Sequence, residues 1–140
     1  MTAAAGSAGV VRLARVYDAD PGDGAPRYLV ERLWPRGVRR DALPLTAWLS
    51  EVAPSTELRR WFGHDPDRWE EFRRRYAAEL DARPSAWRPL ADALAAGDVT
   101  LLYSARDTEH NSAVVLRDHL LASRSARAAA DDAGSRPAAR

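Results

Sequence analysis

The 140-residue chain contains no cysteine and no lysine, and all 21 of its basic residues are arginine. The lack of cysteine excludes a thiolate nucleophile, a disulfide framework, an iron–sulfur cluster and a zinc–thiolate site. The lack of lysine excludes a Schiff base and a P-loop. Any catalysis would therefore have to use histidine, carboxylate, hydroxyl or guanidinium groups.

Long apolar runs and metal-binding motifs are missing as well. No segment approaches the roughly 18 apolar residues of a membrane span, and residues 1–9 lack the basic and apolar regions of a signal peptide. We therefore expect a cytoplasmic protein without membrane attachment. The three histidines do not have the spacing of a known metal motif, so neither a metal site nor a cofactor is predicted.

Composition divides the chain into one domain, residues 10–121, between two tails. Residues 1–9 and 122–140 are rich in alanine, glycine and serine and show little hydrophobic periodicity, which predicts that both are disordered. The second tail holds four arginines against two aspartates, which leaves 17 arginines against 18 acidic residues in 10–121. This balance gives no strong nucleic-acid signal, although weak binding through the basic tail is an alternative. The oligomeric state is left open.

Strand-like and helix-like segments alternate along the domain. The strand patterns are residues 10–16, 28–33 and 99–105, while residues 47–52 fit either a strand or a short helix. Helical patterns begin at Ser55, at Asp65-Pro66, near Trp87, and at Asp107 or Thr108. This alternation predicts a single small α/β domain with a mostly parallel sheet flanked by helices, in a Rossmann-like three-layer arrangement.

Polar residues gather in the two loops that follow the strands at 28–33 and 99–105. The first loop brings Glu31, Arg32 and Arg36, and the second brings Ser104, Arg106, Asp107, His110 and Asn111. Ligands of open parallel sheets bind outside the carboxyl ends of the strands, and guanidinium groups bind phosphate or carboxylate through paired hydrogen bonds. The loops therefore predict a site for a small anionic molecule, either phosphorylated or nucleotide-like.

The candidate residues fall into two groups. The ligand-binding candidates are Arg32, Arg36, Glu31, Ser104 and Asn111. The proton-transfer candidates are His64, His110 and Asp107, which would serve a hydrolase or a transferase. Whether the protein is an enzyme stays open, because Asp107 is equally suited to capping a helix and Arg32 to a structural ion pair with Glu31.

A second hypothesis treats the protein as a non-enzymatic interaction module. Exposed tryptophan and arginine side chains are frequent hot spots of protein interfaces. In this interpretation Trp34, Trp48 and Trp61 would anchor a protein partner.

Three segments together resemble a known family. They are Leu29–Gly37, Ala53–Pro66, and Thr100–Asp107 followed by His110-Asn111. The string is similar to the YeaO-like branch of the domain-of-unknown-function family 488, over roughly Val10 to Leu121. The resemblance implies a small bacterial cytoplasmic α/β protein without an assigned activity. It also implies aspartate where Glu31 stands, and the longer side chain favours binding or ion pairing at this position over a strict catalytic role.

Overall fold

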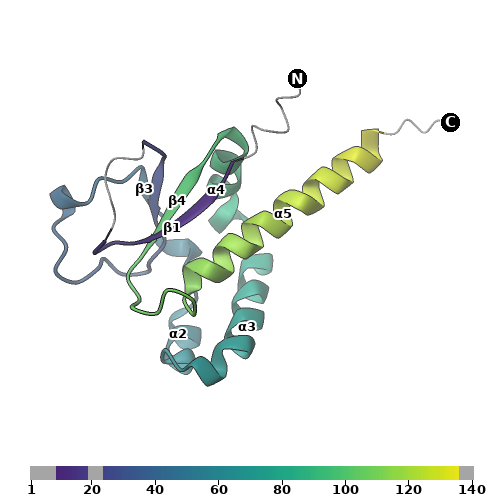
Figure 1. Cartoon of the computed structure of the whole chain (residues 1–140). Helices are drawn as coiled ribbons and strands as arrows, with labels where there is room; N and C mark the ends of the chain where they lie inside the picture. Colours follow the sequence, from purple (N-terminus) through teal and green to yellow (C-terminus); the bar gives the residue numbers. More distant parts are fainter. Residues whose placement is uncertain (1–8, 19–23, 136–140) are drawn as a thin grey trace.

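The computed structural model describes residues 9–18 and 24–135, with side chains up to residue 130. The strands are β1 (Val11–Arg15), β2 (Arg27–Leu29), β3 (Ala47–Trp48) and β4 (Val99–Tyr103). The helices are α2 (Thr56–Phe62), α3 (Trp69–Ala82), α4 (Pro84–Ala96) and α5 (Ser112–Ser135), with 3₁₀ turns η1 (Arg40–Ala42), η2 (Ser50–Val52) and η3 (Pro66–Arg68) between them. Figure 1 shows α3, α4 and α5 gathered beside the sheet.

The four strands form one sheet in the order β1-β4-β2-β3, and all neighbouring pairs are parallel. The last strand of the chain, β4, lies in the middle, where Leu101 pairs with Leu13 and Leu102 pairs with Leu29. A strand that is covered on both faces needs apolar side chains throughout, and all five residues of β4 are buried. The predicted α/β domain with a parallel sheet is confirmed.

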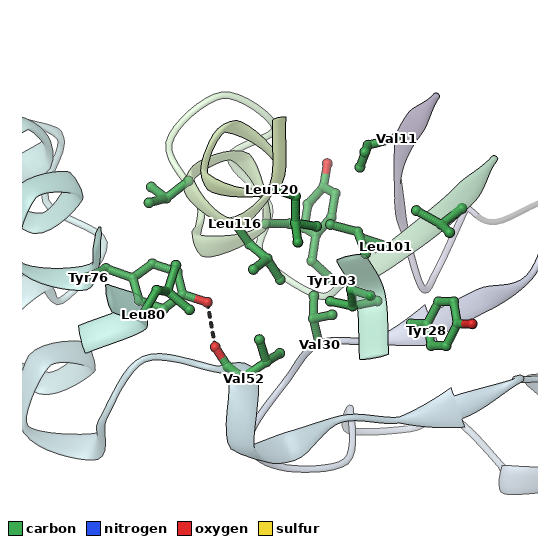
Figure 2. Packing of buried hydrophobic residues seen from close by; sticks show 14 of the residues in the cluster. Val11, Tyr28, Val30, Val52, Tyr76, Leu80, Leu101, Tyr103, Leu116 and Leu120 are labelled. Carbon is green, nitrogen blue, oxygen red and sulfur yellow. Dashed lines mark hydrogen bonds between the residues drawn. The ribbon is translucent and has the colours of Figure 1, made fainter. Parts of the chain in front are cut away.

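The two faces of the sheet are covered by different structures. Tyr28, Val30 and Leu101 pack into a cluster with side chains of α2, α3, α4 and α5 (Figure 2). The alternate residues Leu29 and Leu102 point to the other face, where the irregular chain between β2 and β3 covers them. The α-helices of the described part thus all cover the same face of the sheet. The opposite face, where a third layer of helices was predicted, is covered by the loop that carries η1.

The buried face of α3 is the one that its helical spacing predicts. Trp69, Phe72, Tyr76 and Leu80 are each at most 9% exposed. The Tyr76 hydroxyl donates a hydrogen bond to the carbonyl oxygen of Val52 at 2.6 Å (Figure 2), and burial raises the pKa of this phenol. The bond fixes the segment before α2 against α3.

Helix α5 is longer than predicted. It continues to Ser135, so the expectation of a disordered tail is wrong for residues 122–135, while residues 136–140 lie outside the described part. The segment has little hydrophobic periodicity, but alanine, which dominates it, has the highest helix propensity. Arg124 also donates a hydrogen bond to the carbonyl oxygen of Gly9 at 2.7 Å, which ties the helix to the start of β1.

The N-terminal segment predicted as a tail lies outside the described residues except for Gly9. Within the described ranges, no helix combines the length and the apolar character that crossing a membrane requires.

Candidate functional site

A cavity of about 790 Å³ opens at the carboxyl ends of β2 and β4. Its wall combines the residues after β2, the start and one side of α2, and the loop between β4 and α5. The buried lining residues include the apolar Val30, Phe62 and Phe72 and the polar Asn111. The volume lies within the range of sites that hold small organic ligands.

The structure brings most of the predicted site residues to this cavity. Lining residues among them are Glu31, Arg32, His64, Ser104, Asp107 and Asn111. Arg36 and His110 are not part of the lining. Arg36 is exposed in the turn after Pro35, and its carbonyl oxygen accepts a hydrogen bond from the Tyr17 hydroxyl at 3.0 Å.

Glu31 is the partly buried carboxyl group of the cavity wall. Its backbone carbonyl accepts the indole N–H of Trp48 at 2.6 Å, which fixes the main chain beyond β2. Its carboxylate accepts the backbone N–H of Ser104 at 3.2 Å. Burial raises the pKa of Glu31, and the Ser104 hydrogen bonds, Arg59 and His64 offset only part of that effect. The side chain is thus held in place but takes part in no ion pair among the described residues.

Arg32 has a structural role at the edge of the cavity. Its guanidinium donates hydrogen bonds to the carbonyl oxygens of Ala53 at 2.8 Å and Pro54 at 3.3 Å. The acid nearest to it is Glu51 at 3.9 Å, so the ion pair that the sequence suggested with Glu31 does not form. Arg32 joins the loop after β2 to the turn before α2 and uses two of its five N–H donors in doing so.

The loop before α5 is organised by Asp107 and Asn111. One carboxylate oxygen of Asp107 accepts the backbone N–H groups of Glu109 and His110, both at 2.9 Å. These two hydrogen bonds are the main reason that the pKa of Asp107 lies below its usual value. The cap of α5 itself is Asn111, whose side-chain oxygen accepts the N–H of Val114 at 3.1 Å. The expectation that Asp107 or Thr108 caps α5 is therefore wrong by one turn.

His110 packs into the core side of the same loop. Its Nδ1 lies 2.9 Å from Asp107, and its ring meets the Trp69 ring edge-on with 5.2 Å between the centroids. Histidine and aspartate in this contact resemble the base and the orienting acid of a proton-transfer site. However, the imidazole does not line the cavity, so His110 is not placed to exchange a proton with a ligand there, although Asp107 lines the cavity.

His64 stands at the exposed rim of the cavity. It has a φ of 58° and is the only residue other than glycine with a positive φ in the described part of the chain. The preceding residue, Gly63, ends α2 in the left-handed conformation at a φ of 54°. Two successive left-handed residues turn the chain sharply and direct it along the cavity toward η3.

Three arginines of the lining were not among the candidate site residues, although Arg106 was named with the loop that follows the strand at 99–105. Arg59 and Arg60 lie on α2, and Arg106 lies in the loop after β4. All three are exposed, and none of them forms an ion pair with a described residue. A search limited to the ends of strands overlooks α2, whose only sequence signal is a pair of arginines beside the buried Leu58 and Phe62.

Helix α2 is held firmly enough to place its arginines. The Ser55 hydroxyl accepts the N–H of Leu58 at 3.1 Å, which caps the helix as predicted. Glu79 of α3 in turn accepts the N–H of Ser55 at 2.9 Å and its hydroxyl at 2.6 Å. The guanidinium groups of Arg59 and Arg60 are therefore carried by a helix that is anchored to α3.

The arrangement supports binding of an anion better than it supports catalysis. Guanidinium groups without ion-pair partners are suited to phosphate or carboxylate. No group of three histidine, aspartate or glutamate side chains in the described residues could hold a metal ion. Ser104 lies at the end of β4, but its backbone N–H contacts Glu31 and no histidine contacts its hydroxyl in the described part.

The fold and the cavity define a small α/β protein with a ligand-sized cavity at the carboxyl ends of a parallel sheet. The chain belongs to the family DUF488-N3i, described as the inactive DUF488-N3 subclade, whose model matches residues 10–139. The resemblance found in the sequence segments is thereby confirmed.

The relatives are bacterial proteins without an assigned activity. The chain is 44% identical over 111 residues to the uncharacterized protein YeaO of Escherichia coli (strain K12), which covers 79% of this chain and 96% of YeaO. It is 54% identical over 71 residues to the uncharacterized protein Rv3073c of Mycobacterium tuberculosis (strain ATCC 25618 / H37Rv), which covers 50% of this chain and 59% of that relative. No solved structure matches the chain significantly. The function therefore has to be argued from the site.

Proposed function

We propose that the cavity binds a small anionic molecule, phosphorylated or nucleotide-like, and that the protein acts by binding it. The observation that carries the proposal is the set of three exposed arginines, Arg59, Arg60 and Arg106, around one cavity and without ion pairs among the described residues. Surface arginines next to carboxylates are commonly neutralised, as Arg74 and Arg75 are by Glu71 on α3. Three unneutralised guanidinium groups at a cavity favour an anionic ligand.

A binding function fits this chain better than a hydrolase or a transferase. Asp107 lines the cavity, but its carboxylate is used to organise the loop before α5, and the ring of His110 lies outside the lining. The family description also names the subclade as inactive. Proton transfer would then rest on His64 alone, and that residue has no orienting partner for its ring nitrogens among the described residues.

The two alternatives, a protein-interaction module and nucleic-acid binding through the basic tail, receive less support from the contacts. The indole N–H groups of Trp34 and Trp48 donate to backbone carbonyls, and the two rings pack against each other with 5.6 Å between centroids. Trp61 lies between the guanidinium groups of Arg68 and Arg75. These tryptophans stabilise the fold locally, so the interaction module lacks an obvious anchor. Of the arginines in the basic segment 122–140, Arg124 donates a hydrogen bond to the carbonyl oxygen of Gly9, so this guanidinium is partly used within the fold, which weakens the case for nucleic-acid binding.

Thermal-shift titration with phenyl phosphate tests the proposal, after native mass spectrometry of the purified protein for a retained ligand. A ligand that binds only the folded state raises its stability by about 2.7 kcal/mol at a concentration of 100 times Kd. We expect the melting temperature of the wild type to rise with ligand, and Arg59→Ala and Arg106→Ala to lose most of that response.

Arg88→Ala is the matched control, because Arg88 is an exposed arginine of α4 outside the cavity lining. It should respond like the wild type. An equal response of all four proteins would place the anion elsewhere, and silence across a library of nucleotides and phosphorylated metabolites would overturn the proposal.

A further inference from the structure

We infer that the ligand carries a protonated amine in addition to its anionic group, and that the carboxylate of Glu31 binds this amine. The inference rests on the proposed function, because it concerns the same cavity. It names the ligand class more closely: an amino-bearing aryl or alkyl compound with a phosphate or carboxylate at its other end.

The cavity holds charges of both signs that do not pair with one another. Arg59 is close enough to Glu31 to act on the ionisation of its carboxyl, yet no ion pair joins Glu31 to any described arginine. A ligand with only an anionic group would engage the guanidinium groups and leave the Glu31 carboxylate unpaired beneath it. Covering an unpaired carboxylate costs free energy, whereas an ammonium group placed against it forms a charge-assisted hydrogen bond.

Two acids line the cavity, and Glu31 has more hydrogen-bond acceptor positions available for a ligand than Asp107 has. Asp107 already accepts two backbone N–H groups and contacts the ring of His110. Glu31 accepts hydrogen bonds from Ser104 only. An ionised carboxylate has about four acceptor positions, so Glu31 can accept an ammonium without losing its present bonds.

The middle of the ligand should be apolar. Phe62 and Phe72 stack with 4.3 Å between their centroids and both line the cavity. Leu33 lies at the same cavity with 67% of its surface exposed, so its side chain is accessible to a ligand. The same wall thus offers apolar surface suited to an aromatic ring or a short alkyl chain.

The ionisation of Glu31 gives the inference a pH signature. Burial raises the pKa of Glu31, and an ammonium beside the carboxylate would lower it again, so binding releases a proton when Glu31 starts out protonated. The charged and titratable groups around Glu31 are Arg59 of α2, His64 after α2, Tyr76 of α3 and the neighbouring Arg32. The advantage of the amine should therefore be full above the pKa of Glu31 and disappear as the pH falls through it.

Isothermal titration calorimetry with two matched probes tests the inference. Phenyl phosphate carries only the anionic group, whereas 4-(aminomethyl)phenyl phosphate adds the amine on the same ring. We expect the amine to improve affinity at least about tenfold in the wild type at neutral pH. Glu31→Gln should bind phenyl phosphate and lose this gain, while the control Glu57→Gln, an exposed acid of α2 outside the lining, should keep it.

The outcomes separate the two proposals. Equal affinities of the two probes would overturn the role of Glu31 and leave anion binding standing. A gain that persists in Glu31→Gln would also overturn it, because another group would then hold the amine. Failure of both probes to bind would overturn both proposals. If Glu31→Gln does not fold, the ratio of the two affinities in the wild type decides: a ratio that is constant between pH 4.5 and pH 8 contradicts the inference, since about this range brackets a carboxyl with a raised pKa.

Discussion

Two carboxyl groups at opposite ends of the sheet have pKa values that are shifted in opposite directions. Asp98, just before β4, accepts the N–H of Val10 at 2.9 Å and pairs with Arg12 at 3.0 Å, and these contacts lower its pKa. Glu31, just after β2, is partly buried without an ion pair among the described residues, and burial raises its pKa. The amino end of the sheet neutralises its charges within the protein. At the carboxyl end Arg15 pairs with Asp18, but Glu31, Arg59 and Arg106 beside the cavity have no ion pair among the described residues.

The largest effect is expected for Arg32, a cation beside the cavity whose guanidinium is used structurally. Arg32→Ala removes the donors to the carbonyl oxygens of Ala53 and Pro54. Because hydrogen bonds from a charged group contribute about 1.5–3 kcal/mol, the free energy of unfolding should fall by about 2 kcal/mol in urea denaturation.

Arg36→Ala serves as the control, since that exposed side chain lies outside the cavity and should change stability by less than about 0.5 kcal/mol. If Arg32→Ala costs no more than Arg36→Ala, Arg32 is not a structural tie, and it belongs with the arginines available to a ligand.

The second effect is a gain in stability for Glu31→Gln at neutral pH. The folded state raises the pKa of this carboxyl above its unfolded value of about 4.3, so folding takes up a proton. Wild-type stability is then fully present below the unfolded pKa and is lost as the pH rises through the folded pKa. The glutamine side chain does not titrate. Unfolding free energies at several pH values should show the variant gaining on the wild type as the pH rises, and a difference that does not vary with pH would refute this account.

Asp98→Asn should show the opposite pH dependence with a smaller effect, because this carboxylate lies at the surface, where solvent screens its interactions. A lowered pKa gives stability that is present above the unfolded pKa of about 3.9 and is lost as the pH falls through the folded pKa. The variant should be slightly less stable than the wild type at neutral pH and equal to it in strong acid. A variant that is as stable as the wild type at all pH values would show that the contacts to Val10 and Arg12 contribute nothing.

The smallest effect on stability is expected for the arginines assigned to the ligand. The double variant Arg59→Ala/Arg106→Ala should unfold within about 0.5 kcal/mol of the wild type, since neither side chain has an ion pair in the described part of the molecule. Loss of several kcal/mol would show that these residues support the fold and would remove the main support for the proposed function.

Apolar runs and the helical spacing of apolar residues in the sequence predicted much of the fold. The apolar run at 99–105 indicated the buried central strand, and the spacing of Trp69, Phe72, Tyr76 and Leu80 indicated the buried face of α3. The length of α5 was missed because hydrophobic periodicity does not detect a helix favoured by alanine propensity. The cover of the second sheet face was missed because it is irregular chain, which has no periodic signal.

The site was predicted in outline, and its details depend on tertiary contacts. Strand-end loops indicated Glu31 and Ser104, which meet through a hydrogen bond in the cavity wall. Whether an arginine is free or already bound depends on carbonyl groups that lie 21 and 22 residues away in the chain, and the sequence pattern does not show this for Arg32. Arg59 joins the site only because Glu79 of α3 holds the start of α2 in place.

The most direct measurement is an NMR titration of the ¹⁵N-labelled protein with phenyl phosphate. The account predicts saturable shift changes at the backbone amides of Glu31 and Ser104 and at the side-chain N–H groups of Arg59 and Arg106. The amides of Arg12 and Asp98, at the paired end of the sheet, should not move. Changes confined to that end or to the exposed turns of α5, or no saturable change anywhere, would contradict the claim that the carboxyl end is an anion-binding site.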